Sequence, residues 1–127
     1  MKIAAQGLDC EIRLGPPADD WMEAAVRIRA PGFEGAFECW IWRNDWLQLI
    51  KVLRRLQSSI GQDAVEKWAT LEGNIKLEFR LTRRGALTCA FSFCRNLMEG
   101  PTLSGTFEAD QTFLGGWIEQ AEEDLPR

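Results

Sequence analysis

The stretch Met-Glu-Ala-Ala-Val-Arg-Ile-Arg-Ala, residues 22–30, alternates apolar and polar side chains with a period close to two. Successive side chains of a β-strand point to opposite faces, so this pattern predicts a strand with one buried and one solvated face. Similar alternation recurs at residues 8–14, 33–42, 75–82, 87–94 and 102–108. Residues 64–72 show it only weakly. The sequence therefore predicts about six strands.

Two further segments have helical periodicity instead. In the first, the apolar stripe consists of Trp46, Ile50, Leu53, Leu56 and Ile60. Asn44 precedes this stripe and is a favourable N-cap residue, whereas Lys51, Arg54 and Arg55 lie off its centre and should be solvated. A second helix is expected from near Asp110, whose carboxylate would cap the first turn. Its apolar side would carry Phe113, Leu114, Trp117, Ile118 and Ala121.

Consecutive strands joined by short turns favour antiparallel meanders, and each strand has one apolar face that needs a cover. The two amphipathic helices are the natural cover. We therefore predict an α+β fold, in which an antiparallel sheet of about six strands in two meanders carries both helices on one face. The 127 residues are expected to form a single domain, 1–127, because domains most often have about 100–150 residues.

Composition excludes several classes of function. The chain has no histidine, so it lacks the Ser-His-Asp triad and the usual zinc-enzyme ligands. No metal or cofactor is expected. The net charge of −4 argues against a nucleic-acid partner, which requires a basic surface. No apolar stretch reaches the about 20 residues that cross a bilayer, so no membrane partner is expected.

The cysteines and the N-terminus indicate the cell compartment. Polar Gln6 and acidic Asp9 come too early for the apolar part of a signal peptide, so a cytoplasmic location is expected. The four cysteines contain no CxxC pair and would be thiols in that compartment. Cys10, Cys39 and Cys89 take core-facing positions, and Cys94 is expected to face outward.

The predicted sheet leaves one face open, and three of the six tryptophans alternate with charged residues there. The residues on it are Trp21, Glu23, Arg27, Arg29, Glu34, Glu38, Trp40, Trp42, Lys76, Glu78 and Arg80. Tryptophan and arginine are enriched at binding hot spots, so this face is a candidate protein-binding surface. The predicted partner contacts are Trp21, Arg27, Arg29, Glu38, Trp40 and Trp42. The alternative is that Trp40 and Trp42 lie under a loop, or that a register slip turns Trp42 inward.

Carboxylates are the main candidates for catalysis on this face. Glu34 and Glu38 are four residues apart on one strand, which places them about 13 Å apart. Paired glycosidase carboxylates stand about 5–9 Å apart, so this pair is too widely spaced. An ion pair between Glu38 and Arg27 or Arg29 is the more ordinary expectation.

Three stretches resemble a known family. They are residues 30–38 leading into Asn44-Asp45-Trp46-Leu47, the strand pair around Gly85 after Asn74-Ile75-Lys76-Leu77, and the box at residues 107–114, Phe-Glu-Ala-Asp-Gln-Thr-Phe-Leu. Together they resemble the WapI family of bacterial immunity proteins, cytoplasmic partners of secreted polymorphic toxins. The resemblance implies a protein that binds and blocks the C-terminal effector domain of a cognate toxin. It implies no catalysis, and no functional residues are carried over from it.

Three functional hypotheses follow. The first is a toxin-neutralising immunity protein. The second is a small domain that binds a ligand or peptide, or a homodimer that uses the open face as its interface. The third is an enzyme that uses carboxylates such as Glu34, Glu38 and Glu78. Support for it would need an activity whose pH–rate profile is lost when Glu38 is replaced in Glu38→Gln.

Overall fold

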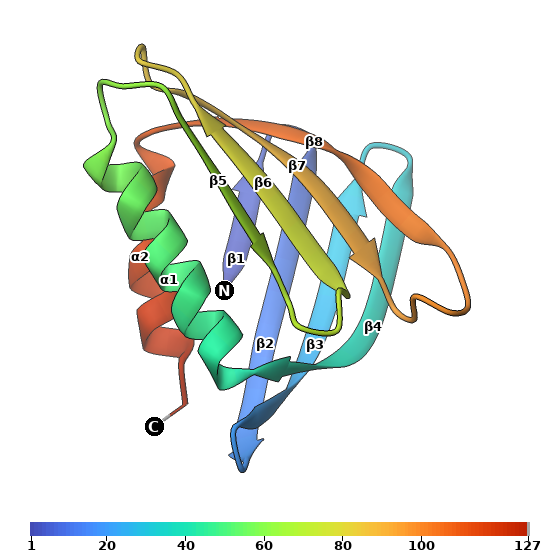
Figure 1. Cartoon of the computed structure of the whole chain (residues 1–127). Helices are drawn as coiled ribbons and strands as arrows, with labels where there is room; N and C mark the ends of the chain where they lie inside the picture. The colour runs from blue at the N-terminus through green and yellow to red at the C-terminus, as the bar shows by residue number, and fades with distance from the viewer. Residues whose placement is uncertain (127) are drawn as a thin grey trace.

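A computed structural model describes residues 1–126, and the chain in it forms two successive units of four strands and a helix (Figure 1). The first unit contains β1 (Lys2–Ala5), β2 (Leu8–Ala18), β3 (Trp21–Ala30), β4 (Phe33–Trp42) and α1 (Arg43–Ser58). The second contains β5 (Ala64–Ala69), β6 (Ile75–Leu81), β7 (Ala86–Cys94), β8 (Thr102–Asp110) and α2 (Phe113–Asp124). The α+β class and the antiparallel strands are as predicted.

Each unit forms its own antiparallel meander, with strand orders β1-β2-β3-β4 and β5-β6-β7-β8. The alternation predicted for β3 is confirmed, since Met22, Ala24, Val26 and Ile28 are all buried. In β6 the same holds for Ile75, Leu77, Phe79 and Leu81. Period-two sequence patterns therefore identify the inner face of both sheets.

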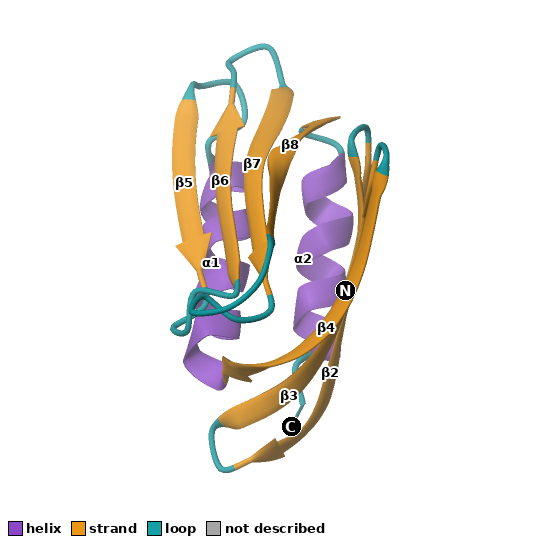
Figure 2. Cartoon of the chain, turned by 90° about the vertical axis from the view of Figure 1, so that its right-hand side faces the viewer, coloured by secondary structure: helices purple, strands orange, loops and turns teal. Residues whose placement is uncertain are grey.

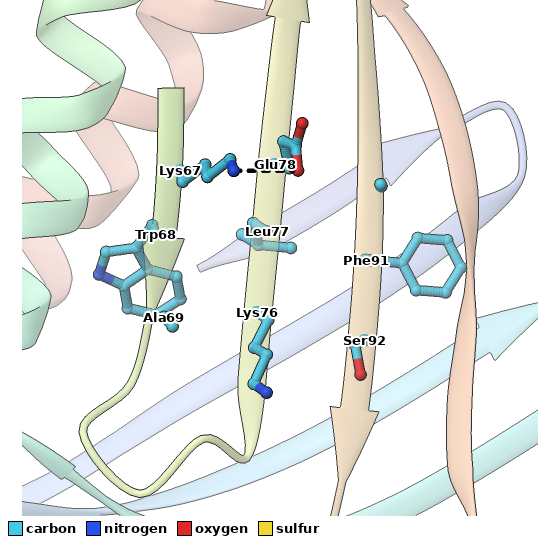
Figure 3. Close-up of a pocket in the computed structure, with 9 residues that line it drawn as sticks. Lys67, Trp68, Ala69, Lys76, Leu77, Glu78, Phe91 and Ser92 are labelled. Carbon is cyan, nitrogen blue, oxygen red and sulfur yellow. Dashed lines mark ion pairs between the residues drawn. The ribbon is translucent and has the colours of Figure 1, made fainter. Parts of the chain in front are cut away.

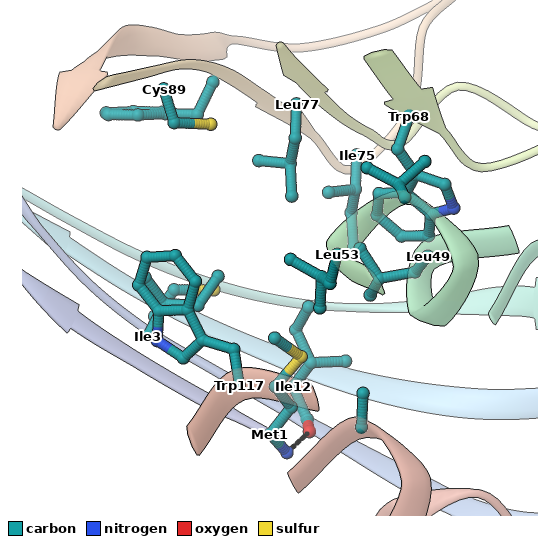
Figure 4. Close-up of a cluster of buried hydrophobic side chains, with 14 of the residues drawn as sticks. Met1, Ile3, Ile12, Leu49, Leu53, Trp68, Ile75, Leu77, Cys89 and Trp117 are labelled. Carbon is teal, nitrogen blue, oxygen red and sulfur yellow. Dashed lines mark hydrogen bonds between the residues drawn. The ribbon is translucent and has the colours of Figure 1, made fainter. Parts of the chain in front are cut away.

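The prediction of a single sheet of about six strands is wrong in the number of sheets and strands, whereas its two meanders are present. The chain has two four-stranded sheets, which lie on two sides of a shared core, with the helices along one side of the pair (Figure 2). The apolar faces of the two sheets contribute to one buried cluster, which Leu49 and Leu53 of α1 and Trp117 of α2 also join (Figure 4). Each sheet thus supplies part of the cover that the prediction assigned to helices alone.

The two sheets are joined by one isolated backbone bridge between Gln6, after β1, and Glu108 in β8. The N–H of Gln6 donates to the carbonyl of Glu108 at 3.1 Å, and the N–H of Glu108 donates back at 2.8 Å. The sheets are therefore closest at the β1 and β8 edges.

Both predicted helix starts need correction. Arg43, whose N–H donates to the carbonyl of Asp20 at 2.7 Å, begins α1 directly after β4, so Asn44 lies inside the first turn and is not its cap. Asp110 ends β8, and its carboxylate accepts from the N–H of Thr112 at 2.8 Å in the turn before α2. The side-chain and backbone hydrogen bonds from Thr112 lower the pKa of Asp110.

Two strands and one cysteine also depart from the prediction. Strand β1 lies outside the predicted strands, and the pattern of β5 is weak, although its Trp68 is buried and donates to the carbonyl of Asp45 at 2.7 Å. Cys10, Cys39 and Cys89 are buried as expected. Cys94 is also buried, because the turn after β7 covers it and its thiol donates to the carbonyl of Asn96 at 3.2 Å. Lys51, Arg54 and Arg55 are exposed, as predicted.

Candidate partner-binding surface

The six residues predicted as partner contacts all lie on the outer face of β3 and β4. The antiparallel register sets Trp21 directly opposite Trp42, and Trp40 opposite Glu23. Glu38 stands opposite Ala25, and Arg27 stands opposite Ala36. Because residues of the same parity share a face of a strand, the alternation in the sequence brings together Trp21, Arg27, Arg29, Glu38, Trp40 and Trp42. We call these six residues the outer β3–β4 face.

The aromatic end of this face is partly solvated. Trp40 has 44% of its surface exposed, and Trp21 and Trp42 are half-buried. Trp42 thus does not turn into the core, and Trp40 is not covered by a loop. The other three tryptophans, Trp46, Trp68 and Trp117, are buried. The tryptophans therefore separate into core residues and a surface group.

The other end of the face is charged and partly neutralised. Arg29 pairs with Glu34 at 3.0 Å, directly across the strands. On β2, Glu11 lies opposite Arg27, and its carboxylate accepts a hydrogen bond from the guanidinium of Arg13. The hydrogen bond from Arg13 lowers the pKa of Glu11, and the nearby charge of Arg27 adds a smaller effect in the same direction.

The predicted ion pair between Glu38 and Arg27 or Arg29 does not form. Arg29 forms its ion pair with Glu34, and the residue opposite Glu38 is the uncharged Ala25. Among residues 1–126, Glu38 has no ion-pair partner within 4.0 Å. Its carboxylate lies exposed on the same face of β4 as Trp40.

Three residues that the sequence assigned to this face lie elsewhere. Lys76, Glu78 and Arg80 belong to β6, on the outer face of the second sheet. There, Glu78 pairs with Arg80 at 2.9 Å and with Lys67 at 4.0 Å, beside a shallow hollow of about 380 Å³ (Figure 3). Alternation assigns a residue to one side of its own sheet, but it does not show which residues share a sheet.

The carboxylates considered for catalysis are therefore divided between two sheets. Glu34 and Glu38 lie on β4, and Glu78 lies on β6. Within residues 1–126, no group of three or more Cys, Asp or Glu side chains is placed to hold a metal ion. No helix in this part of the chain is both long and apolar enough to span a bilayer.

A feature that sequence reasoning missed is an apolar cleft of about 730 Å³ between the two sheets. Phe33 and Phe37 of β4 line it on one side, and Phe93, Leu103 and the turn between β7 and β8, which carries Arg95 and Glu99, line it on the other. Phe33 is 64% exposed, although it has the same parity as the buried Cys39 and Ile41. Both Phe33 and Phe37 stand on the apolar side of the alternation at residues 33–42, so the pattern alone predicts a core position for both, although only Phe37 packs against the core.

The comparisons with known proteins give one match. The family model described as "Immunity protein WapI-like family" matches residues 5–127, which is nearly the whole chain. Neither curated proteins nor solved structures give a significant match.

Proposed function

Because the chain belongs to the WapI-like immunity protein family, we propose that it binds and neutralises the effector domain of a cognate secreted toxin. The partner is the C-terminal toxin domain, and the chain itself catalyses nothing. The cytoplasm is the proposed location, in keeping with four cysteines that are free thiols.

The observation that carries this proposal, besides the family, is the outer β3–β4 face. It combines a partly exposed indole, Trp40, with half-buried Trp21 and Trp42 and with exposed charged residues. Aromatic residues and arginine are enriched in the centres of protein–protein interfaces, where excluding water gives them most of their binding energy. This face therefore supports contact with a protein.

Charge supports the same class of partner. The net charge is −4, which favours rapid encounter with a basic protein and disfavours nucleic acid. A toxin domain that acts on nucleic acid would have the basic surface that fits this charge. Association that slows as salt rises is expected, because exposed charges are screened.

The test is co-expression with the C-terminal domain encoded by the reading frame immediately upstream. We expect growth rescue and a 1:1 complex that survives size-exclusion chromatography. If that domain is toxic, and the chain neither binds it nor protects the cells, the proposal is wrong. A catalytically inactive form of the same domain serves as the binding partner when toxicity prevents expression.

A second function is favoured by the apolar cleft lined by Phe33, Phe37 and Leu103. The chain would then bind a small ligand or peptide, or would self-associate. Sedimentation velocity separates these cases. A stable dimer would support self-association in place of toxin binding, and shielding of Trp21, Trp40 and Trp42 from acrylamide quenching would place its interface on the outer β3–β4 face instead of the cleft.

A further inference from the structure

We propose that the toxin domain docks by adding an extended segment to the free edge of β4 at residues 33–38. The apolar side chains of that segment would enter the cleft beside Phe33 and Phe37, and a basic side chain would lie against Glu38. This inference rests on the proposed function, because it specifies how the partner is held.

The first argument is that contacts occupy at least part of each of the other three sheet edges. At β1, the N–H of Lys2 donates to the side-chain oxygen of Gln120 in α2 at 2.8 Å. At β5, α1 packs along the strand and Arg55 pairs with Glu66. Proteins commonly cover strand edges in this way, because unpaired backbone groups attract other strands.

The edge of β8 is also partly occupied. Gln6 forms the backbone bridge to Glu108, and Gly7 packs so closely that a Cβ on it would lie 2.8 Å from the carbonyl oxygen of Thr106. The β1–β2 turn therefore covers β8 from Thr106 to Glu108.

The edge of β4 differs in its first half. Residues 33–38 pair with β3 on one side, and on the other side they make no backbone hydrogen bond to any described residue. The second half of the strand leads into α1. A free edge of this length is suited to strand addition, in which main-chain hydrogen bonds supply affinity and alternate side chains supply specificity.

The second argument is that the two faces of β4 differ at this edge. Its inner side carries Phe33 and Phe37, which line the apolar cleft, and its outer side carries Glu34 and Glu38. Side chains of an added strand also alternate between the two faces. The complementary segment therefore alternates apolar residues with polar or basic ones.

The third argument is the charge at Glu38. Arg29 neutralises Glu34, whereas Glu38 has no ion pair within residues 1–126. In an antiparallel pair, a side chain directly across the strand is a close neighbour, and opposite charges there are favourable. A lysine or arginine of the partner segment is the residue that fits beside Glu38.

Hydrogen exchange tests the docking mode, with the C-terminal domain of the upstream reading frame as the probe. We expect amides in residues 33–38 to exchange about tenfold or more slowly in the complex than in the free chain.

Phe33→Glu should weaken binding about tenfold or more. Leu71→Glu is the matched control, since Leu71 is 65% exposed on the β5–β6 turn, and it should bind as the unmodified chain does.

The charge argument has its own pair of variants. Glu38→Lys should weaken the complex about tenfold, because it sets like charges across the added pair. Glu123→Lys, an exposed change on α2, should leave affinity unchanged. Both substitutions are at exposed positions, where the fold should tolerate them. If Phe33→Glu misfolds and its binding cannot be interpreted, the comparison of Glu38→Lys with Glu123→Lys still tests the proposal.

The outcomes separate the two proposals. If the unmodified chain does not bind the toxin domain, the proposed function fails and the docking mode fails with it. If it binds while residues 33–38 show no added protection and Phe33→Glu binds normally, the docking mode is wrong and the function stands. Protection of residues 33–38 that rises with the concentration of the free chain would assign this edge to a second copy and would also overturn the proposal.

Discussion

The indole N–H of Trp46 donates a hydrogen bond to the backbone carbonyl of Ala121 at 2.8 Å. Trp46 is fully buried in α1, and Ala121 lies in the last turn of α2. The last four carbonyls of a helix have no partner within the helix, so this side chain satisfies one of them. The bond fixes the position of α1 relative to α2.

Trp46→Phe should therefore destabilise the fold. It removes the hydrogen bond, leaves the Ala121 carbonyl without its donor and opens a small cavity. The expected loss is about 1–3 kcal/mol in the free energy of unfolding. Urea denaturation followed by circular dichroism measures it. Trp40→Phe, an exposed change of the same chemistry, should cost far less, and equal losses for the two variants would contradict this account.

Trp40→Ala should affect binding and spare stability. Trp40 is the most exposed indole of the outer β3–β4 face, so removing it takes away contact area that a partner would cover. The expected loss is about 2 kcal/mol or more in the free energy of binding to the toxin domain. Isothermal titration calorimetry measures the affinity, and urea denaturation measures the fold. A variant that unfolds would show that Trp40 supports the core and that the face is wrongly assigned.

Asn74→Asp should make stability depend on pH. The buried amide of Asn74 donates to the carbonyls of Cys94 and Arg95, at 2.9 Å each. An ionised carboxylate cannot donate and would face both oxygens, so the pKa of the introduced carboxyl would be raised in the folded state. The folded chain would then hold the proton more tightly than the unfolded chain, and stability would fall as pH rises above about 4.

The expected cost of Asn74→Asp is about 1–3 kcal/mol at pH 7 and less at pH 4. Asn74→Ala is the control, because it loses the same two hydrogen bonds without adding a titrating group. The difference in stability between the two variants, measured by urea denaturation at both pH values, isolates the carboxyl. A pH-independent difference would contradict the prediction.

Because three buried thiols have a raised pKa, we expect the free energy of unfolding to fall at alkaline pH. Burial raises the pKa of Cys10 and Cys89 to about 12 and that of Cys39 to about 11, from the ordinary thiol value of 9.0. Above pH 9 the unfolded chain releases these protons while the folded chain keeps them, so stability falls as pH rises toward the folded values. Each thiol contributes a slope of about 1.4 kcal/mol per pH unit in that range.

Urea denaturation at pH 8 and pH 10 under reducing conditions measures this slope. Cys89→Ala should reduce it relative to the unmodified chain, since one of the three raised thiols is gone. Reaction with a thiol reagent should be slow in the native state and fast in urea, because the thiolate forms only on unfolding. Rapid labelling of Cys10, Cys39 or Cys89 in the native chain would refute the assignment.

The sequence predicts the strands well because alternation reports a local property. The burial of Val26 and Leu77 follows from their position in a period-two pattern. What covers those residues does not follow, because the same pattern suits a sheet covered by helices and a sheet covered by another sheet. For this reason the sequence pattern does not reveal the second sheet, and it predicts Arg80 on the same face as Arg27 although the two lie on different sheets.

Local signals fail where tertiary contacts take over. Asn44 is a good cap residue, yet α1 begins earlier because β4 runs directly into it. Cys94 has outward parity, yet the following turn buries it. The outer β3–β4 face could be predicted because its six residues lie on two neighbouring strands. The cleft beside Phe33 could not, because it depends on how far the two sheets lie apart at that point.

The crossed packing of the helices has a consequence for biosynthesis. Helix α1 follows the first sheet along the chain, yet it packs against α2 and β5 as well as β4, and α2 contacts β1 in addition to β8. A nascent chain that has emerged only through Ser58 therefore exposes the apolar side chains of α1 that α2 and β5 cover in the folded protein. These side chains stay exposed until α2 has been synthesised, which favours binding of the growing polypeptide by chaperones.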